Sequence, residues 1–147
     1  MEKDKQGRFR FLEHTADAYI EAYGKNLEEA FENAAYATTD VMTEVEKVEP
    51  KSVEDFTVEG HDLSELLYSW LEELLLEFEL QGMLYSRFKV FDIQKTPDGF
   101  MLHSKAWGEN YNPDKHPSKV GIKAATYHQM EITENGGGAV LRFILDI

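Results

Sequence analysis

Carboxylate groups lie at two widely separated points of the sequence where strands are expected to begin or end. Asp17 closes the polar segment 13–17 and leads into an alternating apolar stretch, and Asp146 is the penultimate residue of a second alternating stretch that runs to Ile147. If that last strand is ordered, the main-chain carboxylate of Ile147 is held beside the Asp146 side chain. Two carboxylates held close together repel each other unless a proton or a cation lies between them.

Asp17, Asp146 and Ile147 would form a cluster of oxygen ligands if the two strands were neighbours. Carboxylate oxygens are hard ligands that suit Ca²⁺, Mg²⁺ or Mn²⁺ and suit zinc or copper poorly. The pattern therefore raises the hypothesis of a divalent cation site. The alternative reading is that each aspartate at a strand end is a turn cap or a solvated surface group.

Signatures of the common enzyme classes are absent. The sequence contains no GxxxxGK[ST], GxGxxG or HExxH pattern, and its five histidines are not at zinc-ligand spacing. The glycines of the segment 135–138 have no Lys-Ser/Thr pair behind them, which favours a plain turn over a phosphate loop. With no cysteine, thiolate metal sites, disulfides and a cysteine nucleophile are excluded. We therefore do not expect an enzyme, and no catalytic residue is assigned.

Two helices are expected. Asn26 lies three residues before Glu29 and Asp62 three before Glu65, and both pairs fit the capping-box pattern that opens a helix. Apolar residues follow at helical spacing from Leu27 to Met42 and from Leu63 to Phe78, and the second helix is expected to end near Gly82. The second apolar stripe could serve as a docking face, but a lone domain of this size must bury such a helix, which favours a core role.

Strands are expected over most of the remaining chain. Alternating patterns occupy 9–11, 18–24, 84–94, 100–107 and 140–147. A strand-rich stretch interrupted by Pro50 is expected near 45–58, and a long strand is expected over 119–133. Turns are expected at 97–99 and 135–138. The pattern predicts an α+β fold in which two helices pack on a mainly antiparallel sheet of six or seven strands. We expect one domain over residues 1–147, with 1–8 flexible.

Charge is the most informative bulk property. The chain of 147 residues carries 28 acidic against 15 basic residues, a net charge of -13. Nucleic-acid binders gain affinity by neutralising phosphates with Lys and Arg, so direct nucleic-acid binding is not expected. Cations and basic protein surfaces are the expected partners, although acidity could also serve solubility alone. The first residues lack a secretory signal and no apolar run is long enough for a membrane helix, so a cytoplasmic location without membrane contact is expected.

Considered together, the polar segments and the helix stripes resemble the archease family. The resemblance extends over residues 9–147 and rests on the order and spacing of several short matches: Glu13-His14-Thr15-Ala16-Asp17, Leu27-Glu28-Glu29-Ala30-Phe31, Val41-Met42-Thr43, the stretch 66–75, Gly108-Glu109, the stretch 122–128 and Asp146-Ile147.

This resemblance implies a function and a site. Archeases are expected to activate the GTP-dependent RNA ligase of tRNA splicing by promoting its guanylylation and its multiple turnover. The family's divalent cation site maps onto Asp17, Asp146 and Ile147, with Ca, Mg or Mn as the metal. Lys123 and Glu109 fall in family-typical segments and are supporting functional candidates. His14 and His128 are further candidates, expected to order the site by hydrogen bonds.

Two other functions stay open at this point. One is a chaperone or modulator of tRNA-modifying enzymes, such as a methyltransferase, which would use the acidic surface without requiring metal. The other is a metal-dependent hydrolase, although no general base or nucleophile is evident beside the carboxylates. The sequence does not indicate the oligomeric state, the ligase-facing surface or the identity of the metal.

Overall fold

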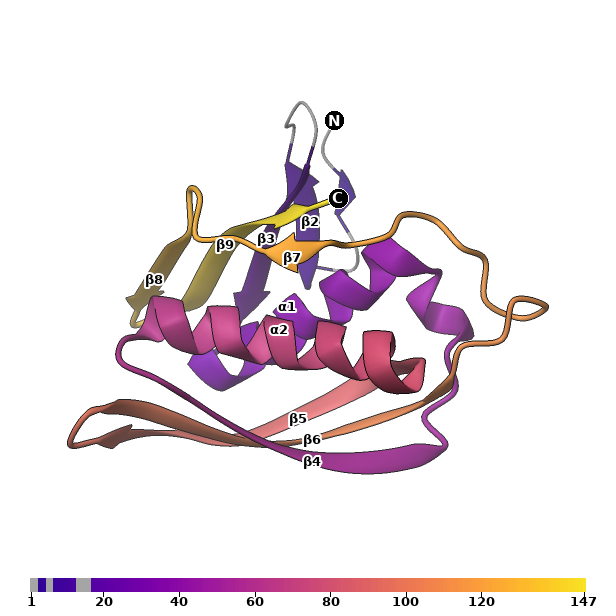
Figure 1. Cartoon of the computed structure of the whole chain (residues 1–147). Helices are drawn as coiled ribbons and strands as arrows, with labels where there is room; N and C mark the ends of the chain where they lie inside the picture. Colours follow the sequence, from indigo (N-terminus) through magenta and orange to yellow (C-terminus); the bar gives the residue numbers. More distant parts are fainter. Residues whose placement is uncertain (1–2, 5–6, 13–16) are drawn as a thin grey trace.

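Two antiparallel sheets enclose a layer of two helices. The computed structural model describes residues 3–4, 7–12 and 17–147. Within these residues the first sheet has six strands in the order β1-β2-β3-β9-β7, with β8 also paired to β9, and the second has three strands in the order β4-β6-β5. Figure 1 shows α1 and α2 lying between the two sheets. The elements in chain order are β1 Lys3–Asp4, β2 Phe9–Leu12, β3 Ala18–Gly24, α1 Leu27–Met42, the 3-10 turn η1 Val45–Lys47, β4 Ser52–Gly60, α2 Leu63–Gln81, β5 Met83–Thr96, β6 Gly99–Asn110, β7 Ala124–Ala125, β8 Glu131–Asn135 and β9 Gly138–Asp146.

The predicted fold class is confirmed. Two α-helices pack on sheets in which the described strand pairs are antiparallel. The strands form two sheets, whereas the sequence pattern predicted one. The reason is that β3 pairs with β9, at the far end of the chain, and not with β4, the next strand in sequence.

Both helices begin at the predicted caps. The side chain of Asn26 accepts a 2.8 Å hydrogen bond from the Glu29 N–H, and Asp62 accepts one of 2.8 Å from the Glu65 N–H. Each such bond satisfies one of the backbone donors that a helix start leaves unpaired. At the end of α2, Gly82 adopts the left-handed conformation with φ 68°, which glycine tolerates without a Cβ clash.

The apolar stripe of α2 is core, as predicted. Leu66, Leu67, Trp70 and Leu71 are fully buried, and the Trp70 indole N–H donates a 3.0 Å hydrogen bond to the Phe31 carbonyl of α1. A buried indole that keeps a hydrogen-bond partner avoids the cost of an unpaired donor. The two helices are therefore joined by both packing and a polar contact.

The long strand predicted over 119–133 is wrong. Only Ala124–Ala125 and Glu131–Asn135 are strands in this stretch. Its backbone N–H groups are shared among three elements: Lys119 bonds the Met42 carbonyl of α1, Ala125 bonds the Glu72 side chain of α2, and Lys123 and Thr126 bond Asp146 and Ile144 of β9. The stretch predicted near 45–58 is likewise split, because residues 45–47 form the turn η1 and β4 begins at Ser52.

Candidate metal site where strands β3, β7 and β9 meet

Strand β9 lies between β3 and β7 at its carboxyl end (Figure 1). On one side Ala18 pairs with Leu145, and on the other Ala124 pairs with Asp146. Asp17 directly precedes Ala18, and Asp146 directly follows Leu145. If the pairing continues by one residue beyond Ala18 and Leu145, Asp17 lies opposite Asp146.

This register also predicts which way the two aspartates point. Residues directly opposite each other in an antiparallel pair share one face of the sheet, and successive residues alternate between faces. The side chains of Ile20 and Leu145 are buried in the core. Ile20 follows Asp17, and Leu145 precedes Asp146, by an odd number of residues, so each aspartate is on the opposite face from the core residue near it. Both aspartates therefore belong to the face of the sheet directed away from the helices. Both are half-buried, so they are shielded yet still open to a solute.

Strand β7 and the residues on either side of it are hydrogen-bonded to β9 and α2. The Lys123 N–H donates a 2.7 Å hydrogen bond to the Asp146 carbonyl, and the Ala125 N–H donates one of 2.7 Å to the Glu72 carboxylate of α2. The Thr126 hydroxyl donates a further bond of 2.9 Å to the Ile144 carbonyl. These three bonds hold the backbone beside Asp146 from the side opposite β3.

Ile147 and Lys123 lie on either side of this junction. The partly buried Ile147 side chain packs against the hydrophobic core, which fixes the main chain directly after Asp146. Lys123 is exposed, and its side chain lines a pocket beside α2 together with Glu72 and Glu79. The Lys123 backbone therefore belongs to the aspartate junction, while its side chain faces the helix side.

The donors at the junction fit a hard cation. Within the described residues no group of three His, Asp or Glu side chains stands close enough to hold a metal ion. The predicted site adds the main-chain carboxylate of Ile147 to the Asp17 and Asp146 side chains. A donor set made only of carboxylate oxygens matches the preference of Ca²⁺, Mg²⁺ and Mn²⁺.

The other candidates are placed differently. His14 lies outside the described residues. His128 is exposed in the turn after β7. Glu109 is in β6 of the second sheet, paired with Leu84 of β5, so its sheet is not the one that carries Asp17 and Asp146.

Glu109 has its own polar cluster, which the sequence did not reveal. Its carboxylate lies 2.7 Å from the Lys115 ammonium and 2.9 Å from His116 Nε2, and it accepts a 2.8 Å hydrogen bond from the Glu49 N–H. His116 is 1% exposed, and its Nδ1 accepts a hydrogen bond from the Asn112 N–H, so Nε2 carries the proton that is donated to Glu109. Burial raises the pKa of Glu109, but the hydrogen bonds from Glu49, Lys115 and His116 outweigh it and hold the pKa at about 2.

This arrangement gives Glu109 a structural role. The carboxylate gathers donors from the segment before β4 and from the loop that follows β6, and Lys115 also bonds Glu49. The pairing of Glu109 with Lys115, His116 and the sequence-distant Glu49 left no periodic signal in the sequence, so that role could not be predicted.

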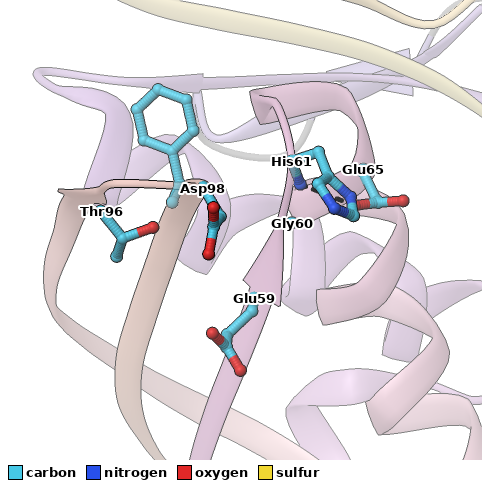
Figure 2. Close-up of a pocket in the computed structure, with 7 residues that line it drawn as sticks. Glu59, Gly60, His61, Glu65, Thr96 and Asp98 are labelled. Carbon is cyan, nitrogen blue, oxygen red and sulfur yellow. Dashed lines mark hydrogen bonds and ion pairs between the residues drawn. The ribbon is translucent and has the colours of Figure 1, made fainter.

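A separate acidic pocket lies between the end of β4, the start of α2 and the β5–β6 turn. Figure 2 shows Glu59, Asp98 and His61 around it, with His61 Nδ1 2.7 Å from the Glu65 carboxylate. His61 is well exposed and its partner Glu65 belongs to the α2 capping box. None of the predicted metal ligands lines this pocket.

Two antiparallel sheets that enclose two helices define a class of small α+β domain, and known proteins share both its sequence and its fold. The profile of the Archease protein family (MTH1598/TM1083) matches residues 9–147. The chain is 47% identical over 140 residues to the protein archease of Sulfurisphaera tokodaii, covering 95% of this chain and 99% of that one. It is 49% identical over 125 residues to the protein archease of Pyrococcus abyssi, covering 85% and 87% of the two chains. This chain belongs to the archease family.

Solved structures agree with that assignment. The solution structure of protein 1598 from Methanobacterium thermoautotrophicum superimposes with a TM-score of 0.83 at 40% identity, covering 97% of this chain and all of that one. The crystal structure of an archease from Thermotoga maritima, described as a "possible chaperone", matches with a TM-score of 0.58 at 19% identity over 92% of this chain and 94% of that one. The second likeness shows the shared fold alone.

Neither helix of the described residues combines the length and apolar character that crossing a membrane requires.

Proposed function

We propose that this protein is an accessory factor, not itself an enzyme, that activates the GTP-dependent RNA ligase of tRNA splicing. It promotes guanylylation of the ligase and lets the ligase turn over repeatedly. Membership of the archease family supports this proposal. The single observation that supports the site is the β3–β9 register, in which Ala18 pairs with Leu145, so that Asp17 and Asp146 are the next residues along the two chains.

Asp17, Asp146 and the main-chain carboxylate of Ile147 are the proposed ligands of Ca²⁺, Mg²⁺ or Mn²⁺. Two like charges on adjacent strands destabilise each other when nothing neutralises them. When bound, a divalent cation supplies charge neutralisation for these oxygens and for a phosphate brought against them. The pairing of Ala18 with Leu145 supports a position of Asp17 near Asp146, and the Lys123 and Ala125 backbone bonds fix the neighbouring segment against β9 and α2.

The charge of the chain favours a protein partner over RNA. At a net charge of -13 the surface repels a phosphate backbone, whereas a ligase with a basic nucleotide channel would attract it. We therefore propose a cytoplasmic protein that docks on the ligase, without direct nucleic-acid or membrane contact. Lys123 is the proposed cation that meets the ligase or its nucleotide beside the junction. His14 and His128 remain proposed ordering groups.

A guanylylation assay with the cognate ligase and GTP tests the proposal. The ligase alone should label slowly, and the added protein should raise both the initial rate and the number of turnovers. Asp17→Asn and Asp146→Asn should lose this stimulation while keeping the far-ultraviolet circular dichroism of the unchanged chain. A stimulation equal to that of the unchanged protein in a folded Asp17→Asn/Asp146→Asn double variant would exclude the metal-site mechanism.

A second candidate function is that of a chaperone or modulator of tRNA-modifying enzymes such as a methyltransferase. The description of the Thermotoga maritima archease as a possible chaperone favours keeping it. Chelation separates the two candidates. A chaperone that acts through its acidic surface keeps its effect after the divalent ions are removed, whereas the ligase activator proposed here loses it.

A further inference from the structure

An apolar groove lies on the helix side of the segment whose backbone bonds Asp146. It runs between the carboxyl-terminal half of α2 and the loop before β7, and it is lined by Leu75, Leu76, Phe78 and Glu79 on one side and by Ile122 and Lys123 on the other. Figure 1 shows this loop passing the end of α2 on its way to β7. Lys123 belongs to both features, because its backbone bonds Asp146 while its side chain lines the groove.

Large apolar side chains around the groove are open to solvent. Leu76 is 43% exposed and Leu80 is 66% exposed, and the two lie one helical turn apart on the same face of α2. Val120, at 40% exposed, adds a third apolar side chain from the loop. Unlike the Leu66 to Leu74 stripe, which is buried, these residues are not needed for the core. A row of exposed leucines on a small domain marks an interaction surface.

The charge that α2 contributes to the groove is of one sign. Helix α2 contains five glutamates, Glu65, Glu72, Glu73, Glu77 and Glu79, and no lysine or arginine. A segment that covers Leu76 and Leu80 therefore passes beside an acidic helix. The complementary segment carries aliphatic side chains for the groove and Lys or Arg side chains for the glutamates.

We propose that this groove is the surface on which the ligase docks, through a segment that combines aliphatic and basic side chains. The inference rests on the function proposed above and adds the surface and the chemistry of the partner segment. Docking there brings the ligase to Lys123, whose backbone N–H is hydrogen-bonded to the Asp146 carbonyl. The groove would therefore place the partner at the β7 edge of the sheet, on the helix side, whereas the Asp17 and Asp146 side chains belong to the opposite face of that sheet.

Direct binding tests the surface separately from activation. The affinity of the ligase for this protein is measured by isothermal titration calorimetry, and guanylylation is measured on the same samples. Leu76→Ser/Leu80→Ser should weaken binding by about tenfold or more, because exposed apolar anchors at an interface centre carry much of the affinity. Val53→Ser and Phe91→Ser are the matched controls, since these side chains are 48% and 52% exposed but lie on the second sheet. Both controls should bind as the unchanged protein does.

The charge of the groove has its own test. Glu79→Gln should weaken binding at low salt and reduce the fall of affinity with added salt, whereas Glu59→Gln on β4 should change neither. Both glutamates are exposed, so neither change should disturb folding.

The outcomes separate the two proposals. Asp17→Asn should lower the maximal guanylylation rate but leave the binding affinity within about twofold, while the double leucine variant should shift the half-saturating concentration and reach the full rate at saturation. Unchanged affinity of a folded Leu76→Ser/Leu80→Ser variant would overturn the docking surface and leave the activator function standing. Absence of any binding between the unchanged protein and the ligase would overturn the docking surface. Tight, leucine-dependent binding without stimulation would support the surface and contradict the proposed activation.

Discussion

The backbone N–H of Ala125 donates a 2.7 Å hydrogen bond to the side-chain carboxylate of Glu72. This bond joins the middle of α2 to β7, and β7 in turn pairs with β9 at Asp146. The position of the backbone on one side of the proposed site therefore depends on a helix residue 53 positions away in the sequence.

Removal of this link should loosen the junction. Glu72→Ala should lower the free energy of unfolding by about 1–3 kcal/mol, because it deletes a charged acceptor and leaves the Ala125 donor without its partner. Glu72→Gln keeps an acceptor oxygen and should cost less. Chemical denaturation measures both, and hydrogen exchange at Ala125 should accelerate in Glu72→Ala. Equal stability of the alanine and glutamine variants would show that the bond does not contribute.

Lys123 should matter for function and not for stability. Its side chain is exposed and its backbone hydrogen bond to Asp146 survives any replacement other than proline. Lys123→Ala should therefore change the free energy of unfolding by less than about 0.5 kcal/mol while reducing stimulation of ligase guanylylation at least tenfold. Lys123→Arg, which keeps the charge, is the control. Full stimulation by Lys123→Ala would remove this residue from the functional site.

Residues added after Ile147 should damage cation binding. A Gly-Gly extension converts the main-chain carboxylate of Ile147 to an amide and moves the negative charge away from Asp146. The Ile147 side chain can keep its packing against the core, so thermal stability in the absence of metal should change little. The affinity for Mn²⁺ should fall by roughly tenfold or more, since one charged ligand is lost. The same affinity in the extended and unextended proteins would eliminate Ile147 as a ligand.

The Glu109 cluster should make stability depend on acid pH. The pKa of Glu109 in the folded protein is about 2, below the ordinary value of 4.5. A lowered pKa contributes stability that is present above pH 4.5 and is lost as the pH falls from there towards 2. The exposed partners screen part of this effect, so we expect a loss on the order of 1–2 kcal/mol. Denaturation of Glu109→Gln should show a flatter profile in this window. A profile as steep as that of the unchanged chain would contradict the assignment.

Local signals predicted the elements, and they did so through identifiable chemistry. Asn26 and Asp62 mark helix starts because their side chains bond the first free N–H groups, and Gly82 marks a helix end because its backbone is left-handed. The buried stripe of α2 and the hairpin turn before β9 follow from patterns within one element. Each of these features depends only on residues close in sequence.

Long-range pairing could not be predicted in the same way. The alternation of Val120 and Ile122 resembles a strand, but both line pockets beside α2 while the N–H groups around them bond separate partners. Similarly, nothing local connects Glu109 with His116 and Glu49. The hypothesis that Asp17 and Asp146 converge came from strand-end chemistry and the family resemblance. The β3–β9 register agrees with it, while the presence of a cation remains a prediction.

The proposed activation of the ligase depends most on a cation held between Asp17 and Asp146. Isothermal titration calorimetry of Ca²⁺ and Mn²⁺ into the chelator-treated protein measures it directly, with Asp17→Asn, Asp146→Asn and the exposed control Asp98→Asn. We predict one bound cation per chain, retained in Asp98→Asn and weakened by about tenfold or more in each of the other two variants. Undiminished binding in Asp17→Asn and Asp146→Asn would contradict the proposed site.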